Sequence, residues 1–301
     1  MEDNYNVVVV CTINEIQNID EYIIFFEKYL NPKHIIIVAD KAVKEVIDSK
    51  NMRVSYIEEN SIYPGMTLEA IRKIISDMTG NKEDAVNRAG WYFQQFIKMA
   101  YAYRCEDENY LVWDADTIPI HAVSMYSQER KKVFDVRTEY CKAYFRTLNR
   151  LFPELKKENN YSFISEHMII DTVIMKELIE KIESNRLLSG NSFWKKILNA
   201  IEMDDIAGSG FSEFETYGTY VEKYYPSVYS VRRWKSLREG TIFYKDGISV
   251  KTMEYLAREF DAVSFEKHPM HLKLQKFMGH KIFQKTAIMV LYQKVAELIK
   301  S

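Results

Sequence analysis

The opening segment limits the kind of sheet that this chain can form. Residues 6–13 read Asn-Val-Val-Val-Val-Cys-Thr-Ile, without the apolar and polar alternation of a half-exposed strand. Such a run is typical of a strand that is buried on both faces in a parallel sheet. Residues 19–30 have apolar side chains at helical spacing, and 34–38 form a second buried run. This order predicts two parallel strands joined by a crossover helix.

Strands and helices continue to alternate along the chain. We expect a polar loop at 14–18 and a mobile polar loop at 79–88. No composition break, linker or repeat divides the sequence, so a single domain over 1–301 is predicted. Its predicted fold class is α/β, with a Rossmann-like, mostly parallel central sheet flanked by helices and a more helical C-terminal part. The other predicted elements are strands at 53–57, 110–113, 229–234 and 262–265, a strand or strand-to-helix corner at 163–171, and helices at 42–48, 66–78, 91–103, 139–152, 172–184 and 283–299.

Composition restricts the partners and the compartment. Lys and Arg number 41 against 43 Asp and Glu, a balance that argues against nucleic-acid binding. The three cysteines, Cys11, Cys105 and Cys141, are too few and too scattered for a disulfide framework. Residues 1–6 are acidic and polar, and no window reaches the roughly 18 apolar residues that span a bilayer. We therefore expect a cytoplasmic protein without a signal peptide or a spanning helix.

Two carboxylates follow the strand expected at 110–113. Asp114 and Asp116 lie one residue apart in Asp-Ala-Asp-Thr, where an apolar strand leaves the sheet. From one turn they can share a divalent cation, which would neutralise a nucleotide diphosphate. A chain of this length contains about one Asp-x-Asp by chance, and a capped turn is the alternative explanation.

The helix expected just before this strand has a polar stripe. Trp91, Gln95 and Lys98 follow i, i+4, i+7 spacing with Gln94 beside them, which would make a wall for a base, a sugar or a phosphate. An ordinary solvated face with a half-buried Trp is the alternative. The neighbouring stripe is expected in the core and consists of Tyr92, Phe96, Met99 and Tyr103.

Together these segments resemble a known family. Residues 90–98, Gly-Trp-Tyr-Phe-Gln-Gln-Phe-Ile-Lys, and 110–117, Tyr-Leu-Val-Trp-Asp-Ala-Asp-Thr, are similar to nucleotide-sugar glycosyltransferases of the GT-A fold, and most of all to a sparsely characterised bacterial branch. The resemblance covers 6–120 by element order and reappears at 212–218, Ser-Glu-Phe-Glu-Thr-Tyr-Gly. It implies a metal-dependent transferase of the hexosyltransferase type. The expected donor is a UDP-sugar, and the expected acceptor is a glycan or lipid-linked glycan of bacterial surface polysaccharide synthesis.

The resemblance also implies roles for individual residues. Asp116 would bind Mn²⁺ or Mg²⁺, while Asp114 would touch the metal or the hydroxyls of the donor's ribose or sugar. A late histidine, His268 or His271, would add a third metal ligand. Residues 1–120 would form the nucleotide-sugar half, 121–280 the acceptor half and 281–301 a C-terminal helix. The residues expected to contact the donor are Thr12, Asn14, Asp40, Trp91, Gln95, Lys98, Asp114 and Asp116.

An inverting transferase needs a carboxylate that accepts the proton of the attacking hydroxyl. Glu213 is our first candidate, because it falls in the first turn of a helix that Ser212 would cap, with Glu215 at the third position. A capping box with acidic first-turn residues is the alternative, and it explains Glu215 better than Glu213. Glu166 is the second candidate base, and a retaining mechanism would need neither glutamate.

Two further expectations concern partners. Residues 223–226 and 232–235 interleave cations with aromatics and would bind the acceptor, with packing of Arg and Lys over aromatic rings as the alternative. The terminal helix has an apolar face flanked by lysines, which fits peripheral contact with the inner face of a membrane or packing on the core. The sequence leaves the oligomeric state undetermined.

Two other functions stay open. An aspartyl-nucleophile phosphohydrolase also begins its site with a strand and Asp-x-Asp. However, Ile118 stands where that class has Thr, and a complete βαβ unit comes first. A non-catalytic module that binds a nucleotide or a glycan is the second alternative.

Overall fold

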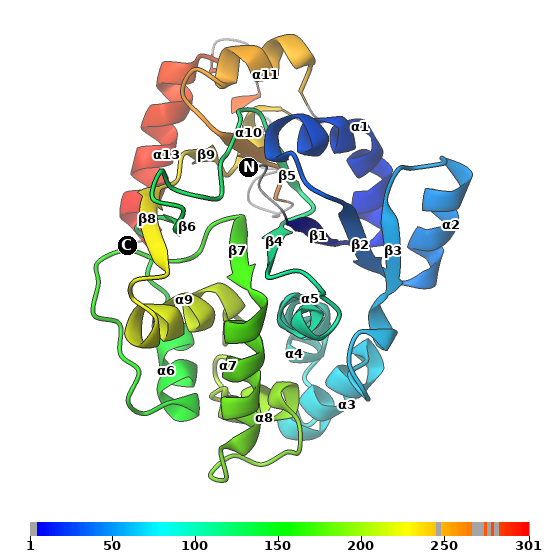
Figure 1. The fold of residues 1–301 in the computed structure, drawn as a ribbon, viewed down its shortest axis with the longest axis vertical. Helices are drawn as coiled ribbons and strands as arrows, with labels where there is room; N and C mark the ends of the chain where they lie inside the picture. Colours follow the sequence, from blue (N-terminus) through cyan, green and yellow to red (C-terminus); the bar gives the residue numbers. More distant parts are fainter. Residues whose placement is uncertain (1–4, 245–247, 267–273, 276–277, 280–282, 301) are drawn as a thin grey trace.

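A five-stranded sheet crosses the middle of the molecule (Figure 1). The computed structural model describes residues 5–244, 248–266, 274–275, 278–279 and 283–300. The strand order is β3-β2-β1-β4-β7, parallel throughout except for β7, which runs antiparallel to β4. These strands are β1 (Asn6–Val10), β2 (Ile35–Ala39), β3 (Ser55–Glu58), β4 (Asn109–Trp113) and β7 (His167–Asp171).

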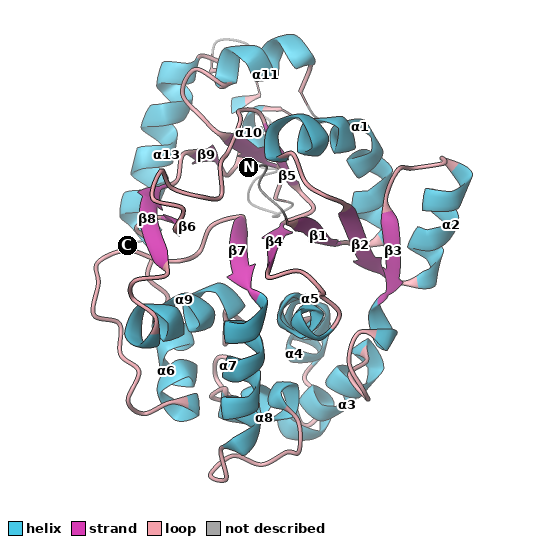
Figure 2. Cartoon of the chain, viewed as in Figure 1, coloured by secondary structure: helices cyan, strands magenta, loops and turns pink. Residues whose placement is uncertain are grey.

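Helices cover both faces of this sheet, with α1 on one side and α5 and α7 on the other (Figures 1 and 2). This arrangement confirms the predicted α/β fold class with a mostly parallel central sheet and a more helical second half. The longer helices are α1 (Ile13–Leu30), α2 (Lys41–Ser49), α3 (Leu68–Thr79), α5 (Ala89–Ala100), α6 (Lys142–Leu151), α7 (Thr172–Ser184), α8 (Phe193–Ala200), α9 (Glu213–Tyr224) and α13 (Thr286–Lys300), and the shorter ones are α4 (Glu83–Asn87), α10 (Gly240–Phe243) and α11 (Val250–Leu256).

Two small sheets accompany the large one. β5 (Thr117–Pro119), β10 (Ala262–Ser264) and β9 (Ser236–Leu237) form the first, in the order β5-β10-β9. β6 (Lys132–Val136) and β8 (Tyr229–Arg233) form the second as a parallel pair. The three-stranded sheet has its own apolar cluster, separate from the main core and built mainly from Ile118, Leu237, Ile242, Phe243, Leu256, Val263 and Met289.

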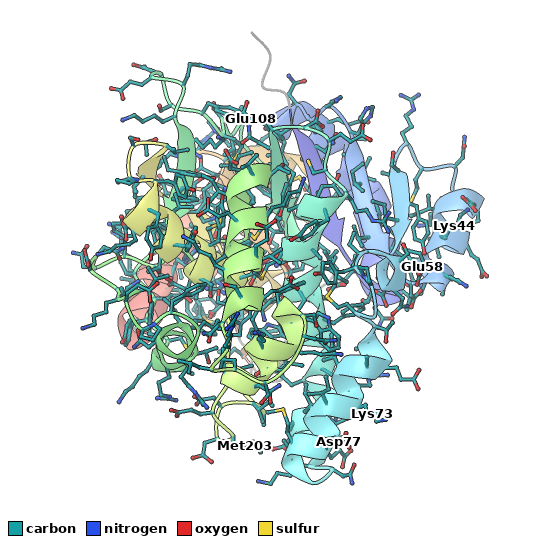
Figure 3. The ribbon with its side chains drawn as sticks, turned by 60° about the horizontal axis from the view of Figure 1, so that its bottom comes forward. Lys44, Glu58, Lys73, Asp77, Glu108 and Met203 are labelled. Atoms are coloured by element: carbon teal, nitrogen blue, oxygen red, sulfur yellow. The ribbon has the colours of Figure 1, made fainter. Side chains whose placement is uncertain are left out.

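Helical periodicity explains how the outer helices attach to this core. In α3, Ile71 and Ile75 are buried one turn apart. Lys73 and Asp77, two positions further along the same helix, point outward (Figure 3). The apolar stripe therefore faces the core, and the charged stripe stays in water.

Several predicted boundaries were wrong. The first strand ends at Val10, and residues 14–18 are helical instead of forming a loop, because α1 begins at Ile13. Glu15 stabilises this start, since its carboxylate accepts hydrogen bonds from the Thr12 backbone N–H at 2.7 Å and from Thr12 Oγ1 at 2.9 Å. The loop expected at 79–88 contains α4, where the acidic residues of the first turn favour a helix.

The C-terminal helix packs through one side only. Met289 is fully buried in the apolar cluster of the small sheet, whereas Leu291 and Val295 are exposed. Within the described ranges, no helix combines the length and the hydropathy that crossing a membrane requires.

Substituting Gly218 by Ala is expected to destabilise the protein by about 1–3 kcal/mol through overpacking. A Cβ at this position on α9 would overlap the buried ring of Phe163. Gly90→Ala on α5 is the matched control, because nothing lies within 4 Å of its added Cβ. That variant is expected to be stabilised by about 0.5–1 kcal/mol. Urea unfolding measures both changes, and equal effects of the two substitutions would contradict the packing argument.

Candidate active site

Asp114 and Asp116 lie on one tight turn at the carboxyl end of β4. The Thr117 N–H donates to the Asp114 carbonyl at 3.1 Å, which closes the turn. The Asp114 N–H in turn donates to the Glu166 carbonyl at 2.8 Å, because β4 pairs with β7 as far as Trp113 and His167. Both carboxylates line a cleft of about 500 Å³ between this edge of the sheet and the starts of α5 and α9.

Lys98 joins two of the acidic residues in this cleft. Its Nζ donates to Asp114 Oδ1 at 2.7 Å and to Glu213 Oε1 at 2.8 Å. Burial opposes the charged form, yet the neighbouring carboxylates of Asp114 and Glu213 raise the pKa of Lys98 above its ordinary value. The side chain of Asp114 stays 34% exposed, whereas that of Glu213 is only 5% exposed. Lys98 therefore holds a cleft-lining carboxylate and a buried one in a fixed arrangement.

Gln95 fixes the start of α9. Its Oε1 accepts the backbone N–H of Glu213 at 3.2 Å. The Ser212 hydroxyl accepts the backbone N–H of Glu215 at 3.2 Å and so caps the same helix. Trp91, Gln95 and Lys98 of the polar stripe line the cleft together with Gln94, and their contact with a donor stays a prediction. In the neighbouring stripe, Tyr92, Phe96 and Met99 are buried as predicted, but Tyr103 is 40% exposed.

Asp116 lies in an acidic environment without a cationic partner in the described part of the chain. Its Oδ1 accepts hydrogen bonds from Thr117 Oγ1 at 3.1 Å and Ser264 Oγ at 3.3 Å. Burial and the charges of Asp114, Glu266 and Glu15 raise the pKa of Asp116 to about 7. No group of three or more His, Cys, Asp or Glu suited to a metal is found among the residues that the structure describes. His268 and His271, the predicted third ligands, lie outside the described residues.

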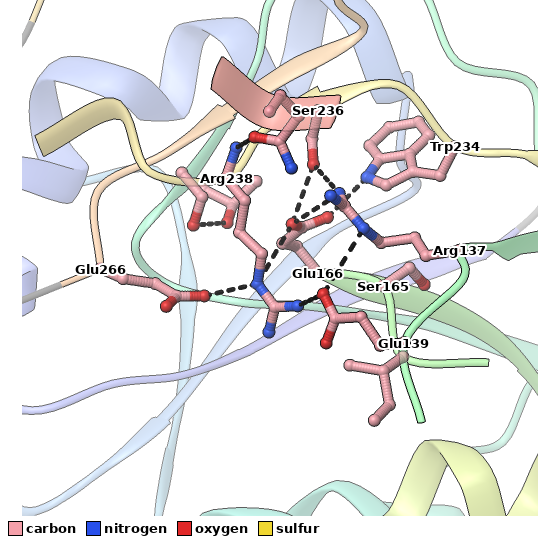
Figure 4. A network of polar contacts seen from close by, with 12 residues as sticks. Arg137, Glu139, Ser165, Glu166, Trp234, Ser236, Arg238 and Glu266 are labelled. Atoms are coloured by element: carbon pink, nitrogen blue, oxygen red, sulfur yellow. Dashed lines mark hydrogen bonds and ion pairs between the residues drawn. The ribbon is translucent and has the colours of Figure 1, made fainter. Parts of the chain in front are cut away.

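Glu166 has a different environment from Glu213 (Figure 4). Its Oε1 accepts a hydrogen bond from Ser236 Oγ at 2.9 Å and lies 3.5 Å from Arg137 Nη1. Its Oε2 accepts the indole N–H of Trp234. Burial alone would raise the pKa of Glu166, but Arg137 and Arg238 hold it below its ordinary value. Both carboxylate oxygens are thus engaged in the interior, and neither is available to a substrate.

Three residues expected to contact the donor are not among the lining residues of the cleft. Asp40 caps α2, where its Oδ1 accepts the N–H groups of Ala42 at 2.7 Å and Val43 at 3.2 Å. Thr12 and Asn14 are exposed at the start of α1. None of the three is among the residues described here as lining the cleft, although Glu15 is.

The aromatic and cationic segments expected to bind the acceptor make contacts elsewhere. Arg232 pairs with Asp135 at 2.6 Å, and the Tyr224 hydroxyl donates to Glu154 at 3.0 Å. No residue of 223–226 or 232–235 belongs to the described lining of the cleft. Arg232 and Lys223 are thus held by ion pairs within the protein, and neither the predicted acceptor contact nor the packing alternative is tested by these contacts.

The cleft also contains residues that were not among the candidates from the sequence, including Glu15, Arg88, Tyr144, Arg238 and Glu266. Only Arg88 had a usable signal, because it precedes Trp91 by three positions and so continues the polar stripe of α5 backwards. Because Arg88 was expected in the loop at 79–88, it was not recognised as part of the polar stripe. The others reach the cleft through tertiary packing, which no local pattern records.

The sequence matches one protein family over most of its length. Residues 6–238 match the family described as "Family of unknown function (DUF6492)", which is more than half of the sequence. The chain therefore belongs to this family. No curated protein matches it in sequence.

Its structural neighbours are glycosyltransferases at low identity. Mouse xyloside xylosyltransferase 1, apo form, matches with a TM-score of 0.43 and 10% identity, over 87% of this chain and 97% of that one. The bifunctional glycosyltransferase WbbM matches with a TM-score of 0.43 and 11% identity, over 89% and 46%. The apo form of the glycosyltransferase GlyE of Streptococcus pneumoniae matches with a TM-score of 0.40 and 10% identity, over 99% and 65%. Similarity this remote assigns neither an activity nor a substrate to the chain.

Proposed function

We propose that this protein is a metal-dependent glycosyltransferase of the hexosyltransferase type. It transfers a sugar from a nucleotide donor, with UDP as the expected nucleotide, to a glycan or a lipid-linked glycan. One observation carries the proposal: Asp114, Asp116 and Glu213 line a single cleft at the carboxyl edge of the sheet. Ligands of open α/β sheets bind at this edge. The cytoplasmic location, the role in surface polysaccharide synthesis and peripheral membrane contact remain predictions from the sequence.

The acidic end of the cleft suits a hard divalent cation. Asp116 has no cationic partner among the described residues, while Glu15 and Glu266 add negative charge near it. Carboxylate oxygens are the ligands that Mg²⁺ and Mn²⁺ prefer, and Mg²⁺ commonly uses only one or two carboxylates plus substrate phosphates. Asp116 would therefore be the main ligand, with the Asp114 oxygen that Lys98 does not use as the second. When bound, such a cation stabilises negative charge on the departing diphosphate.

Glu213 is suited to accept the acceptor's proton. Lys98 occupies its Oε1, which leaves Oε2 for a hydroxyl in the cleft. As the acceptor oxygen forms its bond to the anomeric carbon of the donor, its proton would pass to Glu213, and the bond from that carbon to the diphosphate oxygen would break. Lys98 and Gln95 act as positioning residues, because both hold Glu213 in place. Glu166 is assigned to the interior network that holds Arg137 and Arg238.

Calorimetry with UDP and Mn²⁺ tests the metal assignment. We expect wild type to bind UDP more tightly with Mn²⁺ than without, and Asp116→Ala to lose that difference. Asp77→Ala, an exposed change on α3 outside the cleft, is the control and should leave binding unchanged. Equal affinity of wild type and Asp116→Ala, independent of metal, would refute the assignment.

Turnover separates the transferase from the alternatives. A screen of nucleotide sugars should show metal-dependent release of the sugar from one donor. Rapid hydrolysis of a generic phosphate ester with Mg²⁺, without any response to nucleotide sugars, would instead identify a phosphohydrolase. Binding of UDP without turnover of any donor would indicate a binding module.

A further inference from the structure

Arg88 contributes to the cleft a cation that no carboxylate of the described residues pairs with. The residue connects α4 to α5, and its half-buried side chain lines the cleft. Its guanidinium carbon lies 3.9 Å from the ring centroid of Trp91, a stacked cation–π arrangement. Its Nε donates to the Gly208 carbonyl at 2.9 Å. The stacking and this hydrogen bond fix the plane of the guanidinium group.

The other cations that line the cleft in the described part of the chain, Lys98 and Arg238, are paired with carboxylates. Lys98 pairs with Asp114 and Glu213, and Arg238 pairs with Glu266 at 2.7 Å. Arg146, on the neighbouring α6, pairs with Asp205 and Glu202. Arg88 makes no ion pair with any carboxylate in the described ranges, and burial lowers its pKa. A half-buried guanidinium without a counter-ion is costly unless a ligand supplies one.

The surroundings of Arg88 also fit an anionic ligand. Gln94, Tyr144, Ser209 and Ser212 line the same cleft as Arg88 and offer amide and hydroxyl donors. The carboxylates that dominate the Asp116 side, Glu15 and Glu266, contrast with these neutral groups. The cleft thus combines acidic residues that suit a cation with a guanidinium that suits an oxyanion.

We propose that Arg88 and Trp91 form a subsite for an acceptor sugar that bears an oxyanion, either a carboxylate or a phosphate. Trp91 would contact the ring of the sugar, and Arg88 would bind two oxygens of its anionic group. Calling this ligand the acceptor rests on the proposed transferase function. The anion subsite itself depends only on Arg88, Trp91 and their neighbours.

Tryptophan fluorescence offers a direct test. Trp113, Trp194 and Trp234 are buried, and Trp91 is the half-buried tryptophan of the cleft. Titrations of the full chain would use glucose, glucuronate and glucose 6-phosphate, with and without saturating UDP and Mn²⁺. We expect at least one anionic sugar to bind about tenfold or more tightly than glucose, since hydrogen bonds to charged groups are the strong ones. The tighter of the two anionic sugars identifies the carboxylate or the phosphate as the preferred group.

Variants decide whether Arg88 is responsible. Arg88→Gln should abolish the preference for the anionic sugar, and Arg88→Lys should keep part of it, because Lys retains the charge without the fork. Arg150→Gln, an exposed change on α6 outside the cleft, is the matched control and should behave like wild type. The proposal is overturned if wild type binds the three sugars equally or binds none, or if Arg88→Gln keeps the preference. Loss of anionic-sugar binding in the presence of UDP and Mn²⁺ would also overturn it, since the subsite would then belong to the donor.

This test is separate from the test of the transferase function. The calorimetric experiment compares metal-dependent UDP binding between wild type and Asp116→Ala, and its outcome does not depend on Arg88. Failure of the sugar titration alone would leave the donor site intact. Failure of the UDP experiment alone would leave an anion subsite without a transferase.

Discussion

Glu213→Gln is expected to lower kcat about 100- to 10,000-fold, the usual contribution of general base catalysis. The amide keeps the size of the side chain and can still accept the hydrogen bond from Lys98, but it cannot take a proton from the acceptor. UDP binding in the presence of Mn²⁺ should stay close to that of wild type. Initial rates with the donor found by the nucleotide-sugar screen, together with calorimetry, measure the two effects.

Glu215→Gln is the matched control for this substitution. Glu215 lies two residues further along α9 and is buried, but it contacts Ser162 and Lys157 and does not line the cleft. We expect its replacement to affect stability more than kcat. If Glu213→Gln retained wild-type turnover, Glu213 would not be the base, and a retaining mechanism would become the better explanation.

Lys98→Met is expected to destabilise the protein by about 3–5 kcal/mol, the usual effect of removing one partner of a buried ion pair. The substitution leaves the buried carboxylate of Glu213 and the neighbouring Asp114 without their shared cation. Activity should fall as well, because the two carboxylates lose the group that fixes them. Urea unfolding at neutral pH measures the change in the free energy of unfolding.

A double variant separates charge from packing in this cluster. Adding Glu213→Gln to Lys98→Met removes one of the two unpaired charges, so the double variant should be more stable than Lys98→Met alone. Additive losses in the double variant would mean that Lys98 stabilises the protein through its aliphatic packing. In that case Lys98 would not be the electrostatic link between α5 and α9.

Local patterns predicted the elements of this site but not how they meet. Continuous apolar runs predicted β1, β2 and β4, and helical spacing predicted the polar stripe of α5. Both patterns can be read from residues that are close together in the sequence. The contact of Lys98 with Glu213 joins positions 115 residues apart, and no local period specifies it. For the same reason, the sequence ranked Glu213 before Glu166 only from its expected place in a first helical turn, and it could not show that Arg137 and Arg238 lie beside Glu166.

The wrong predictions of a loop at the start of α1 and over 79–88 have a different cause, which lies in how helix starts are stabilised. Polar residues favour loops on average, but at these helix starts the Glu15 carboxylate accepts the N–H of Thr12 and the Asp84 carboxylate accepts the N–H of Ala85. A polar stretch of this composition is therefore compatible with a loop and with the start of a helix. Arg88 was missed with the second stretch, although it continues the stripe of Trp91.

The two carboxylates of the turn are anchored to different sheets. The backbone of Asp114 is bonded to Glu166 beside β7 of the large sheet, whereas the Asp116 carbonyl accepts the N–H of Phe265 at the end of β10 in the small sheet. The turn that carries both carboxylates therefore joins the large sheet to the small one. A ligand bound by both side chains would add a second connection between these two sheets, whose apolar clusters are separate.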